Sequence, residues 1–446
     1  MLTWQRNKRV SITGYSVLGL LVMSTILLLL MAGSAAAAPI KITIQGNAPH
    51  LRALAPVIEE YNAQQDRIEV SLVLTEISFE NMVVKYVGGT LPDIIESGPR
   101  FTQPLAREGI LADLTPYLQR AGAGFMQQFI PATMVDNQLD GRLYALPAFL
   151  QIEGMYYNPD ILSQAGLGSP PRGWTWADLK AMAQKARRYD SEGKKIIYPL
   201  YSEGWFQADF PLLGQAGGKF VTDDYKVVIN SQPVRDTFNW MYNMIEEDLL
   251  ECANARGKGL HEVVSLENWY FNTAFTFSAT YRQDRWNSVG ANFVTAPPLR
   301  FNNQTEPSTR FTDRSWAITM VSPEQRDAAF EVIQYLLSPK PLAQWTVALG
   351  NPPATRGAIS DPLFRNYLSN NRNMQIWVNE WASLPSSRAY PIEMEQDLYL
   401  ASGAVIADLH TKFIQGEITL NAFLTEGERI LQNLISDPER PWRHAR

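Results

Sequence analysis

One stretch, residues 140–162, constrains the fold of this chain more than any other. It opens on an Asp-Gly turn signal and continues as an almost unbroken apolar and aromatic run from Leu143 to Tyr157. Pro147 argues against an ordinary central strand, and the Asn-Pro-Asp step after the run stops it and can cap a helix. The single carboxylate of the run, Glu153, must be paired or face a cleft, because an isolated charge in apolar surroundings is costly.

The segment before this stretch alternates between strand and helix patterns. Strand patterns cover residues 40–44, 67–74 and 91–97, and apolar residues at helical spacing cover residues 50–65 and 78–87. This order predicts an α/β fold with a mainly parallel sheet. Ligands bind beyond the carboxyl ends of strands in such sheets, so the loops at 45–47 and 96–100 are candidate ligand contacts. The second loop could also be a plain turn with Arg100 as a solvated charge.

The N-terminus has the pattern of a signal peptide. Three cations lie within the first nine residues, an apolar run covers residues 17–31, and small residues of the A-x-A kind follow at 33–38. We therefore expect residues 1–38 to be a secretory signal peptide that is cleaved near its end. Because the apolar run is long, an uncleaved single-helix anchor is the alternative. No cysteine follows the run, so we do not expect a lipoprotein.

Composition argues against several classes of function. The 446-residue chain has a net charge of −6, and since its first 38 residues carry three cations and no acid, the remainder carries −9. An acidic body argues against a nucleic-acid binder. The one cysteine, Cys252, cannot form an internal disulfide, and the four histidines are far apart, so we expect no metal site and no cofactor. The chain also lacks the G-x-S-x-G, Walker and H-E-x-x-H motifs of common enzyme classes.

Three passages together resemble one known family. The D-G-x-x-Y-A-L-P segment at 140–147, followed by Tyr-Tyr-Asn at 156–158, is similar to the first hinge crossing of family 1 extracellular solute-binding proteins, the maltose-binding-protein-like components of ABC importers. Residues 105–118, which end in D-L-T-P-Y-L, resemble the passage that follows the P-D-I strand of that family. A strand, an S-P-E helix start and the segment 350–356 resemble its third crossing. Residues 269–272 depart from the glycine motif that relatives carry there.

This resemblance implies a fold with two lobes. It predicts an α/β periplasmic-binding-protein-like fold with three hinge crossings and a helical C-terminal region. Lobe one would take residues 40–151 and 299–355, and lobe two would take residues 155–296 and 356–440. The second crossing would lie at 292–298. Ligand would be held between the lobes, which would close around it by a hinge motion.

The resemblance also implies a set of ligand contacts. Glu153 lies in the first crossing, where the maltose-binding relative uses a carboxylate on sugar hydroxyls, and its alternative role is an ion pair that holds the hinge. The other expected contacts are Asn47, Ser97 and Arg100 on loops of lobe one, the aromatic faces of Trp205, Tyr281 and Trp316, and Arg356 at the third crossing.

The function implied is that of an extracytoplasmic solute-binding protein, periplasmic or extracellular, that delivers a sugar or oligosaccharide to the permease subunits of an ABC transporter. We expect a monomer that is not an enzyme and binds no nucleic acid. A glycerol phosphate ester or a polyamine could be bound by the same mechanism. A secreted glycosidase-type enzyme and a membrane-anchored receptor ectodomain are the alternatives from other classes.

Overall fold

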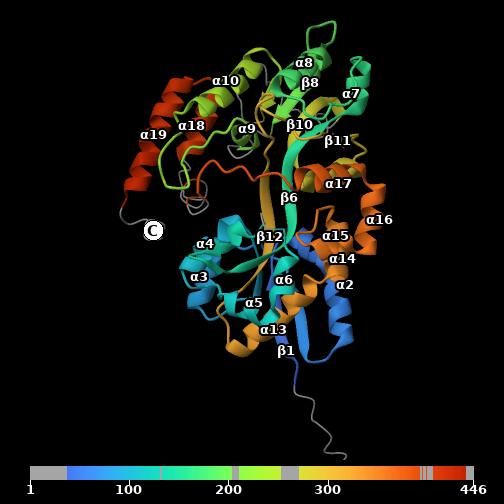
Figure 1. Cartoon of the computed structure of the whole chain (residues 1–446), viewed down its shortest axis with the longest axis vertical. Helices are drawn as coiled ribbons and strands as arrows, with labels where there is room; N and C mark the ends of the chain where they lie inside the picture. The colour runs from blue at the N-terminus through green and yellow to red at the C-terminus, as the bar shows by residue number, and fades with distance from the viewer. Residues whose placement is uncertain are drawn as a thin grey trace, which may run out of the picture.

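The structure is a computed structural model, and it describes residues 38–130, 133–202, 210–252, 271–391, 394, 398 and 405–437. These residues form one ten-stranded sheet in the order β2-β1-β3-β12-β6-β10-β8-β7, in which β11 also pairs with β6 and β9 with β8 (Figure 1). A separate hairpin joins β4 to β5. The strands are β1 (Ile40–Gln45), β2 (Ile68–Val73), β3 (Ile94–Ser97), β4 (Gln138–Leu139), β5 (Arg142–Leu143), β6 (Ala145–Tyr157), β7 (Arg188–Tyr189), β8 (Lys195–Ser202), β9 (Leu250–Cys252), β10 (Thr273–Ala279), β11 (Val294–Thr295) and β12 (Arg310–Ile318).

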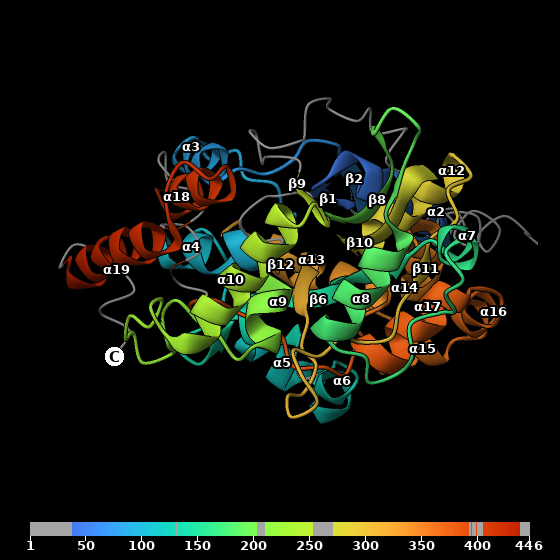
Figure 2. The same ribbon diagram turned by 90° about the horizontal axis from the view of Figure 1, so that it is seen from above.

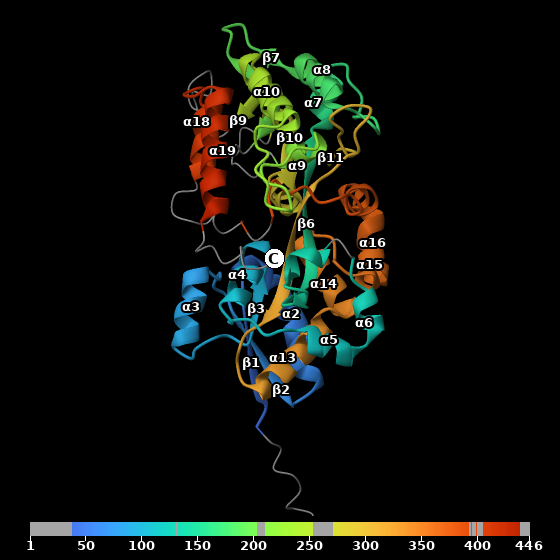
Figure 3. The ribbon, with the colours of Figure 1, turned by 60° about the vertical axis from the view of Figure 1, so that its left-hand side comes forward.

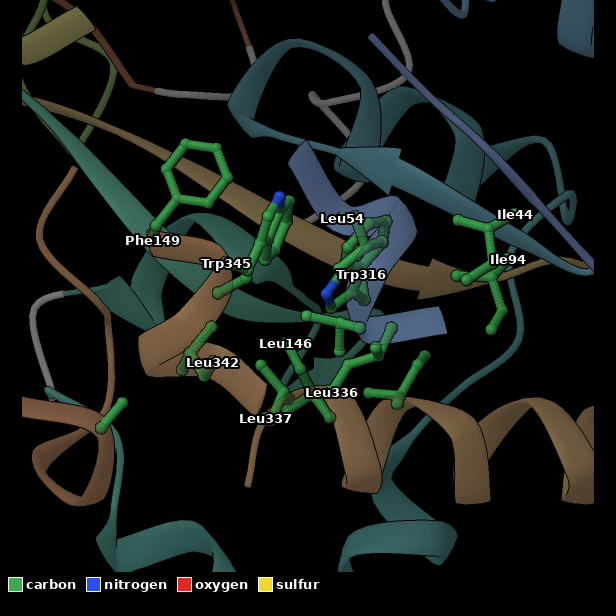
Figure 4. Packing of buried hydrophobic residues seen from close by; sticks show 14 of the residues in the cluster. Ile44, Leu54, Ile94, Leu146, Phe149, Trp316, Leu336, Leu337, Leu342 and Trp345 are labelled. Atoms are coloured by element: carbon green, nitrogen blue, oxygen red, sulfur yellow. The ribbon is translucent and has the colours of Figure 1, made fainter. Parts of the chain in front are cut away.

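Lobe one, the lower half of Figure 1, is built on the parallel strands β1, β2 and β3. Its core joins Ile44 and Ile94 of the sheet to Leu54 on one helix and to Trp345 on another (Figure 4). The strands and helices expected between residues 40 and 97 are confirmed. The helices of this lobe are α2 (Ala48–Gln64), α3 (Phe79–Val87), α4 (Pro99–Arg107), α5 (Thr115–Ala121), α6 (Ala123–Gln127), the short η2 (Val135–Asn137), α13 (Pro323–Leu336) and α14 (Pro339–Leu349).

Lobe two, the upper half of Figure 1, is built on β8, which runs parallel to both β9 and β10. Its buried side chains form a second core cluster that includes Trp174, Phe238 and Phe423. Seen from above, α19 and α16 lie on opposite sides of the molecule (Figure 2). The helices of this lobe are α7 (Pro159–Gln164), α8 (Trp176–Ala186), α9 (Phe210–Gln215), α10 (Gln232–Glu246), η4 (Thr280–Arg282), α12 (Gln283–Ser288), α18 (Val405–Ile414) and α19 (Leu420–Ser436).

Two helix starts of lobe two follow directly from the sequence. The Asn158 side chain accepts the backbone N–H groups of Asp160 and Ile161 at 3.0 and 3.2 Å and so caps α7 after the apolar run. Thr175 and Asp178 form a reciprocal capping box at the start of α8. The apolar run therefore ends where its cap signal predicts.

Strands β6 and β12 connect the lobes (Figures 1 and 3). The 13 residues of β6 pair with β12 along one edge, from Ala145 to Glu153, and with β10 along the other edge, from Glu153 to Tyr157. Strand β12 continues past β6 to pair with β3 in lobe one. The apolar run is therefore a strand that belongs to both lobes, and a register shift next to Arg314 accommodates Pro147.

The other crossings fall later in the chain than the sequence suggests. Residues 292–298 stay with lobe two, because β11 pairs with the far end of β6 and the following Leu299 joins the second core cluster. The chain returns to lobe one only in β12.

The third crossing is also delayed. Residues 356–370, expected in lobe two, pack on α14 of lobe one, and Ala358 and Phe364 are buried in the cluster that contains the lobe-one core. The chain then meets lobe two from Asn373 onward. The Asn373 side chain bonds to the backbone of Phe293 and Thr295, the Trp381 indole N–H donates to the Ala296 carbonyl, and the Ala389 carbonyl accepts the N–H groups of Phe220 and Val221. The intervening elements are α15 (Arg356–Ser360), α16 (Pro362–Asn370), α17 (Arg372–Ile376) and the π-helix η5 (Trp377–Trp381).

These hinge helices pack against β6 at a glycine. A Cβ on Gly154 would lie 2.7 Å from the Trp377 ring and 2.8 Å from the Trp381 ring. The Trp377 indole N–H also donates to the Tyr156 hydroxyl at 3.1 Å. The missing side chain therefore lets two buried tryptophans approach the crossing strand.

Within the part of the chain that the structure describes, no helix has the length and apolar character needed to cross a membrane. The expected signal peptide lies almost entirely outside the described residues, which begin at residue 38.

We predict that Gly154→Ala destabilises the protein by about 1–3 kcal/mol, because the new methyl group overpacks the two tryptophans. The control is Gly168→Ala, where a Cβ would meet nothing within 4 Å. Chemical denaturation measures both free energies of unfolding. Equal stability of the two variants would contradict the account of the hinge packing.

Candidate functional site

The carboxyl ends of the parallel strands of the two lobes point toward one segment of β6 and β12. On the lobe-one side, the last residue of β3, Ser97, pairs with Ser315 of β12. On the lobe-two side, the last residue of β10, Ala279, pairs with Glu153 of β6, which in turn pairs with Arg310. The segment between the two edges covers residues 149–153 of β6, about 13 Å of extended chain. Ligands of α/β sheets bind at such carboxyl edges, so this is the candidate site.

Glu96 is the buried carboxylate of the lobe-one edge. Only 4% of its surface is exposed. One carboxylate oxygen accepts the Asn47 backbone N–H at 2.9 Å, and the other lies 2.5 Å from Nδ1 of His50. Both partners lie at the N-terminal end of α2, where the helix dipole favours a negative charge. A Cβ on Gly46 would lie 2.6 Å from the Glu96 Cβ, so this arrangement requires a glycine.

Sequence reasoning identified the loop that contains Glu96 but did not single out Glu96 or His50. The available signal was a carboxylate directly after the apolar Ile94-Ile95 step, together with a histidine in the first turn after Gln-Gly-Asn. What the sequence does not reveal is that a carboxylate on β3 reaches the first turn of α2, which begins 48 residues before it.

The three ligand contacts expected in lobe one, Asn47, Ser97 and Arg100, all lie at this edge, but their side chains have different neighbours. The Asn47 side chain donates a hydrogen bond to the Glu76 carboxylate. Ser97 is fully buried, and its hydroxyl lies 2.7 Å from the Thr102 hydroxyl, so it is paired within its own loop. Arg100 lies in the first turn of α4 and is partly exposed.

Glu153 forms an ion pair at the lobe-two end of the segment. Its carboxylate accepts a hydrogen bond from the Arg310 guanidinium at 2.9 Å, and the two side chains are 14% and 10% exposed. The hydroxyl of the neighbouring Thr309 donates to the Glu153 backbone carbonyl. The ion pair that the sequence allowed as the alternative role of Glu153 is thus present in the structure.

A second arginine of β12, Arg314, lies near the lobe-one edge. Its Nε is 4.0 Å from a carboxylate oxygen of Glu96. The sequence analysis missed both Arg310 and Arg314, although their spacing was a usable signal, because residues i and i+4 of a strand share a face.

Two expected ligand contacts have structural roles instead. Trp316 is fully buried in the lobe-one core, with its ring stacked on Trp345 at a centroid distance of 5.1 Å (Figure 4). The ring is enclosed in the lobe-one core, so it presents no face to solvent. The Arg356 guanidinium donates to the Gln127 carbonyl at 2.6 Å and to the Phe129 carbonyl at 3.4 Å, which ties α15 to the end of α6.

Of the remaining expected contacts, Tyr281 lies in η4, directly after the carboxyl end of β10. Trp205 lies outside the described residues.

Two polar contacts bridge the lobes near the site. The Thr280 hydroxyl, at the end of β10, donates to the Asn351 side chain at 2.7 Å and accepts the Ile152 N–H at 3.3 Å. Arg388 forms an ion pair with Asp136 of η2. Because the neighbours of Arg388 bond to lobe two, this ion pair joins lobe two to lobe one.

Another buried charge cluster lies at the outer end of lobe two and has the features of a structural network. Lys195 contacts the carboxylates of both Asp248 and Glu251, and the Tyr189 hydroxyl donates to Asp248. Burial is the main cause that raises the pKa of Glu251 above its usual value. These groups satisfy one another, so the cluster stabilises the start of β8 rather than the candidate site.

Comparison with known proteins supports the two-lobed architecture. The family model described as bacterial extracellular solute-binding protein matches residues 47–342. Among solved structures, the sugar-binding protein MalE from Xanthomonas citri superposes with a TM-score of 0.73 at 17% identity, covering 91% of this chain and 99% of that one.

Curated relatives match over a shorter length. A protein of Brucella abortus (strain 2308) named as a binding protein is 27% identical over 187 residues, which are 39% of this chain and 44% of the relative. The arabinooligosaccharide-binding protein of Bacillus subtilis (strain 168) is 23% identical over 217 residues, 48% of this chain and 45% of the relative. The matches thus span less than half of the length of these relatives.

We predict that Arg310→Ala lowers the free energy of unfolding by about 1.5–3 kcal/mol, because it leaves the largely buried Glu153 carboxylate without its charged hydrogen-bond donor. The control is Arg120→Ala, which removes an ion pair to Asp327 whose side chains are 63% and 67% exposed. That change should cost less than about 1 kcal/mol. Urea unfolding curves test both values, and an equally small effect at Arg310 would show that the pair does not hold the hinge.

Proposed function

The chain belongs to the family of bacterial extracellular solute-binding proteins, and from this premise we propose that it captures a sugar or oligosaccharide between its lobes and delivers it to the permease subunits of an ABC transporter. The observation that carries the proposal is the meeting of both carboxyl sheet edges at the crossing segment of β6 and β12. A solute bound there touches both lobes at once, so its binding energy can drive their closure.

The chemistry of the segment suits a polyhydroxylated ligand. Glu96 and Glu153 supply acceptors, while Arg314 and the Asn47 amide supply donors. Sugar hydroxyls both donate and accept hydrogen bonds, so a site of mixed polarity can satisfy them. The names of the arabinooligosaccharide-binding relative and the sugar-binding MalE neighbour are consistent with this ligand class.

Among the residues expected from the sequence, we retain Asn47, Arg100, Glu153 and Tyr281 as proposed ligand contacts. Asn47 and Arg100 lie at the carboxyl edge of lobe one, Glu153 lies at the lobe-two end of the crossing segment, and Tyr281 follows the end of β10. Trp205 follows β8, whose end lies at the same edge of lobe two, and it remains a proposal from the sequence.

Closure of the two lobes would create the surface that a permease recognises. The bridging contacts of Thr280 and Arg388 join elements of opposite lobes, so they are suited to distinguish an open from a closed arrangement. A ligand shifts such an equilibrium only by the difference between its affinities for the two states. We propose that the protein acts as a monomeric carrier and that it returns its solute chemically unchanged.

We further propose that residues 1–38 direct export and are then removed, so that the carrier works outside the cytoplasm. The family and the small-residue segment at 33–38 support this. Mass spectrometry of the protein isolated from its host should find an N-terminus between residues 35 and 40. A retained residue 1 would contradict removal and favour the anchored receptor.

Ligand binding is tested by a thermal-shift screen against monosaccharides, oligosaccharides, glycerol phosphates and polyamines. A true ligand at a hundred times its dissociation constant should stabilise the protein by about 2.7 kcal/mol. The ligand recovered from the protein should be chemically intact. Recovery of cleaved ligand would contradict the carrier proposal and indicate an enzyme.

The site itself is tested with Asn47→Ala, which should weaken binding of the identified ligand about three- to tenfold through the loss of one hydrogen bond. The control is Asn303→Ala, at an exposed loop position of lobe two. Equal affinities of the two variants would place the ligand elsewhere.

A further inference from the structure

We propose that Arg314 is a specificity-determining residue that selects solutes carrying an anionic group, a carboxylate or a phosphate on a sugar or polyol. The inference rests on the proposed function and deepens it, because it narrows the solute class.

The register of the sheet places Arg314 at the candidate site. Its neighbour Ser315 pairs with Ser97, the last residue of β3, so Arg314 lies one residue beyond the end of that strand. On its other side Arg314 pairs with Phe149, whose ring packs edge-on against His50 at 5.3 Å. Arg314 therefore occupies the start of the segment that joins the two carboxyl edges.

The guanidinium of Arg314 has one buried donor without an acceptor in the part of the chain that the structure describes. Its Nε is buried and has no hydrogen-bond partner among the described residues. The Glu96 carboxylate, at 4.0 Å, is beyond hydrogen-bond distance, and its two oxygens already accept from Asn47 and interact with His50. The side chain is 32% exposed, so a solute can reach it. A buried donor without a partner is costly in a native protein, and at the carboxyl edge of a sheet a ligand can supply the missing acceptor.

Arg310, on the same strand, is an arginine whose guanidinium has a carboxylate partner. It donates to Glu153 at 2.9 Å and is only 10% exposed. The pair neutralises itself, so it contributes little net charge to the site. Among the described residues Arg314 has no such carboxylate at hydrogen-bond distance, although the two arginines are four residues apart on one strand.

The remaining charges favour an anion over a cation. Each nearby carboxylate already has a partner. Glu96 interacts with the N-terminal end of α2 and with His50, and Glu153 pairs with Arg310. Glu76 accepts a hydrogen bond from the Asn47 side-chain amide. A polyamine would find these carboxylates engaged and Arg314 repelling it. A carboxylate or phosphate can accept two parallel N–H bonds from one guanidinium, the geometry in which arginine binds most strongly.

The test compares matched neutral and anionic solutes on the exported full chain. The pairs are galactose oligomers with galacturonate oligomers, glucose with glucuronate, and glycerol with glycerol 3-phosphate. Calorimetry or thermal shifts give the affinity of the wild type, Arg314→Gln and Arg314→Lys. The matched control is Arg326→Gln on α13, whose Nε is also buried without a hydrogen-bond partner.

We expect the wild type and Arg326→Gln to prefer the anionic member of at least one pair by tenfold or more. Arg314→Gln should abolish that preference while neutral solutes bind as before, and Arg314→Lys should retain part of it. Preference for a uronate identifies a sugar acid, and preference for glycerol 3-phosphate identifies a phosphate ester. The preference should shrink as salt is added.

Two other results have distinct meanings. Neutral sugars bound equally by the wild type and Arg314→Gln, with no preference for anions, would overturn this inference and leave the proposed function standing. No binding of any pair member by the wild type would count against the proposed function as well. If Arg314→Gln does not fold, Arg314→Lys and the salt dependence of the wild type decide the question.

Discussion

The antiparallel ladder between β6 and β12 is the interaction on which the rest of the structure depends. The two strands pair over residues 145–153 and 310–317, and their outer edges carry the sheets of both lobes. Since backbone hydrogen bonds set the register, they also set the distance between the two carboxyl edges. The hinge helices pack on this ladder through Gly154, where any larger residue would meet two tryptophans. A change in the register of this ladder would separate Glu153 from Arg310.

The ladder also explains why charges can lie within such an apolar run. Glu153 is acceptable there because the register brings Arg310 opposite it. Glu96 is acceptable because Gly46 lets the first turn of α2 approach it. Arg314 alone of these groups lacks a hydrogen-bonding counterpart within the described residues, and it lies where a solute touching lobe one would meet the crossing strands. Fold stability and ligand selection are therefore set by the same short segment.

Much of this architecture could be predicted from local signals. The alternation of patterns over residues 40–97, the cap at Asn158 and the capping box at Thr175 all act within a few residues of the chain, and the structure confirms them. Predictions that depended on contacts between residues far apart in the sequence were less accurate. The sequence could not show that Trp316 stacks on Trp345, or that residues 356–370 would pack on lobe one. The spacing of Arg310 and Arg314 shows that they share a face of a strand, but the sequence could not place them beside Glu153 and Glu96, which lie about 160 and 220 residues away.

The central claim is that a solute held at the crossing segment draws the two lobes together about β6 and β12. The most direct measurement is small-angle X-ray scattering of the protein with and without a ligand identified by thermal shift. The account predicts a smaller radius of gyration and a shorter maximum dimension when the ligand is bound. A ligand that binds and stabilises the protein while the scattering curve stays unchanged would contradict capture by lobe closure.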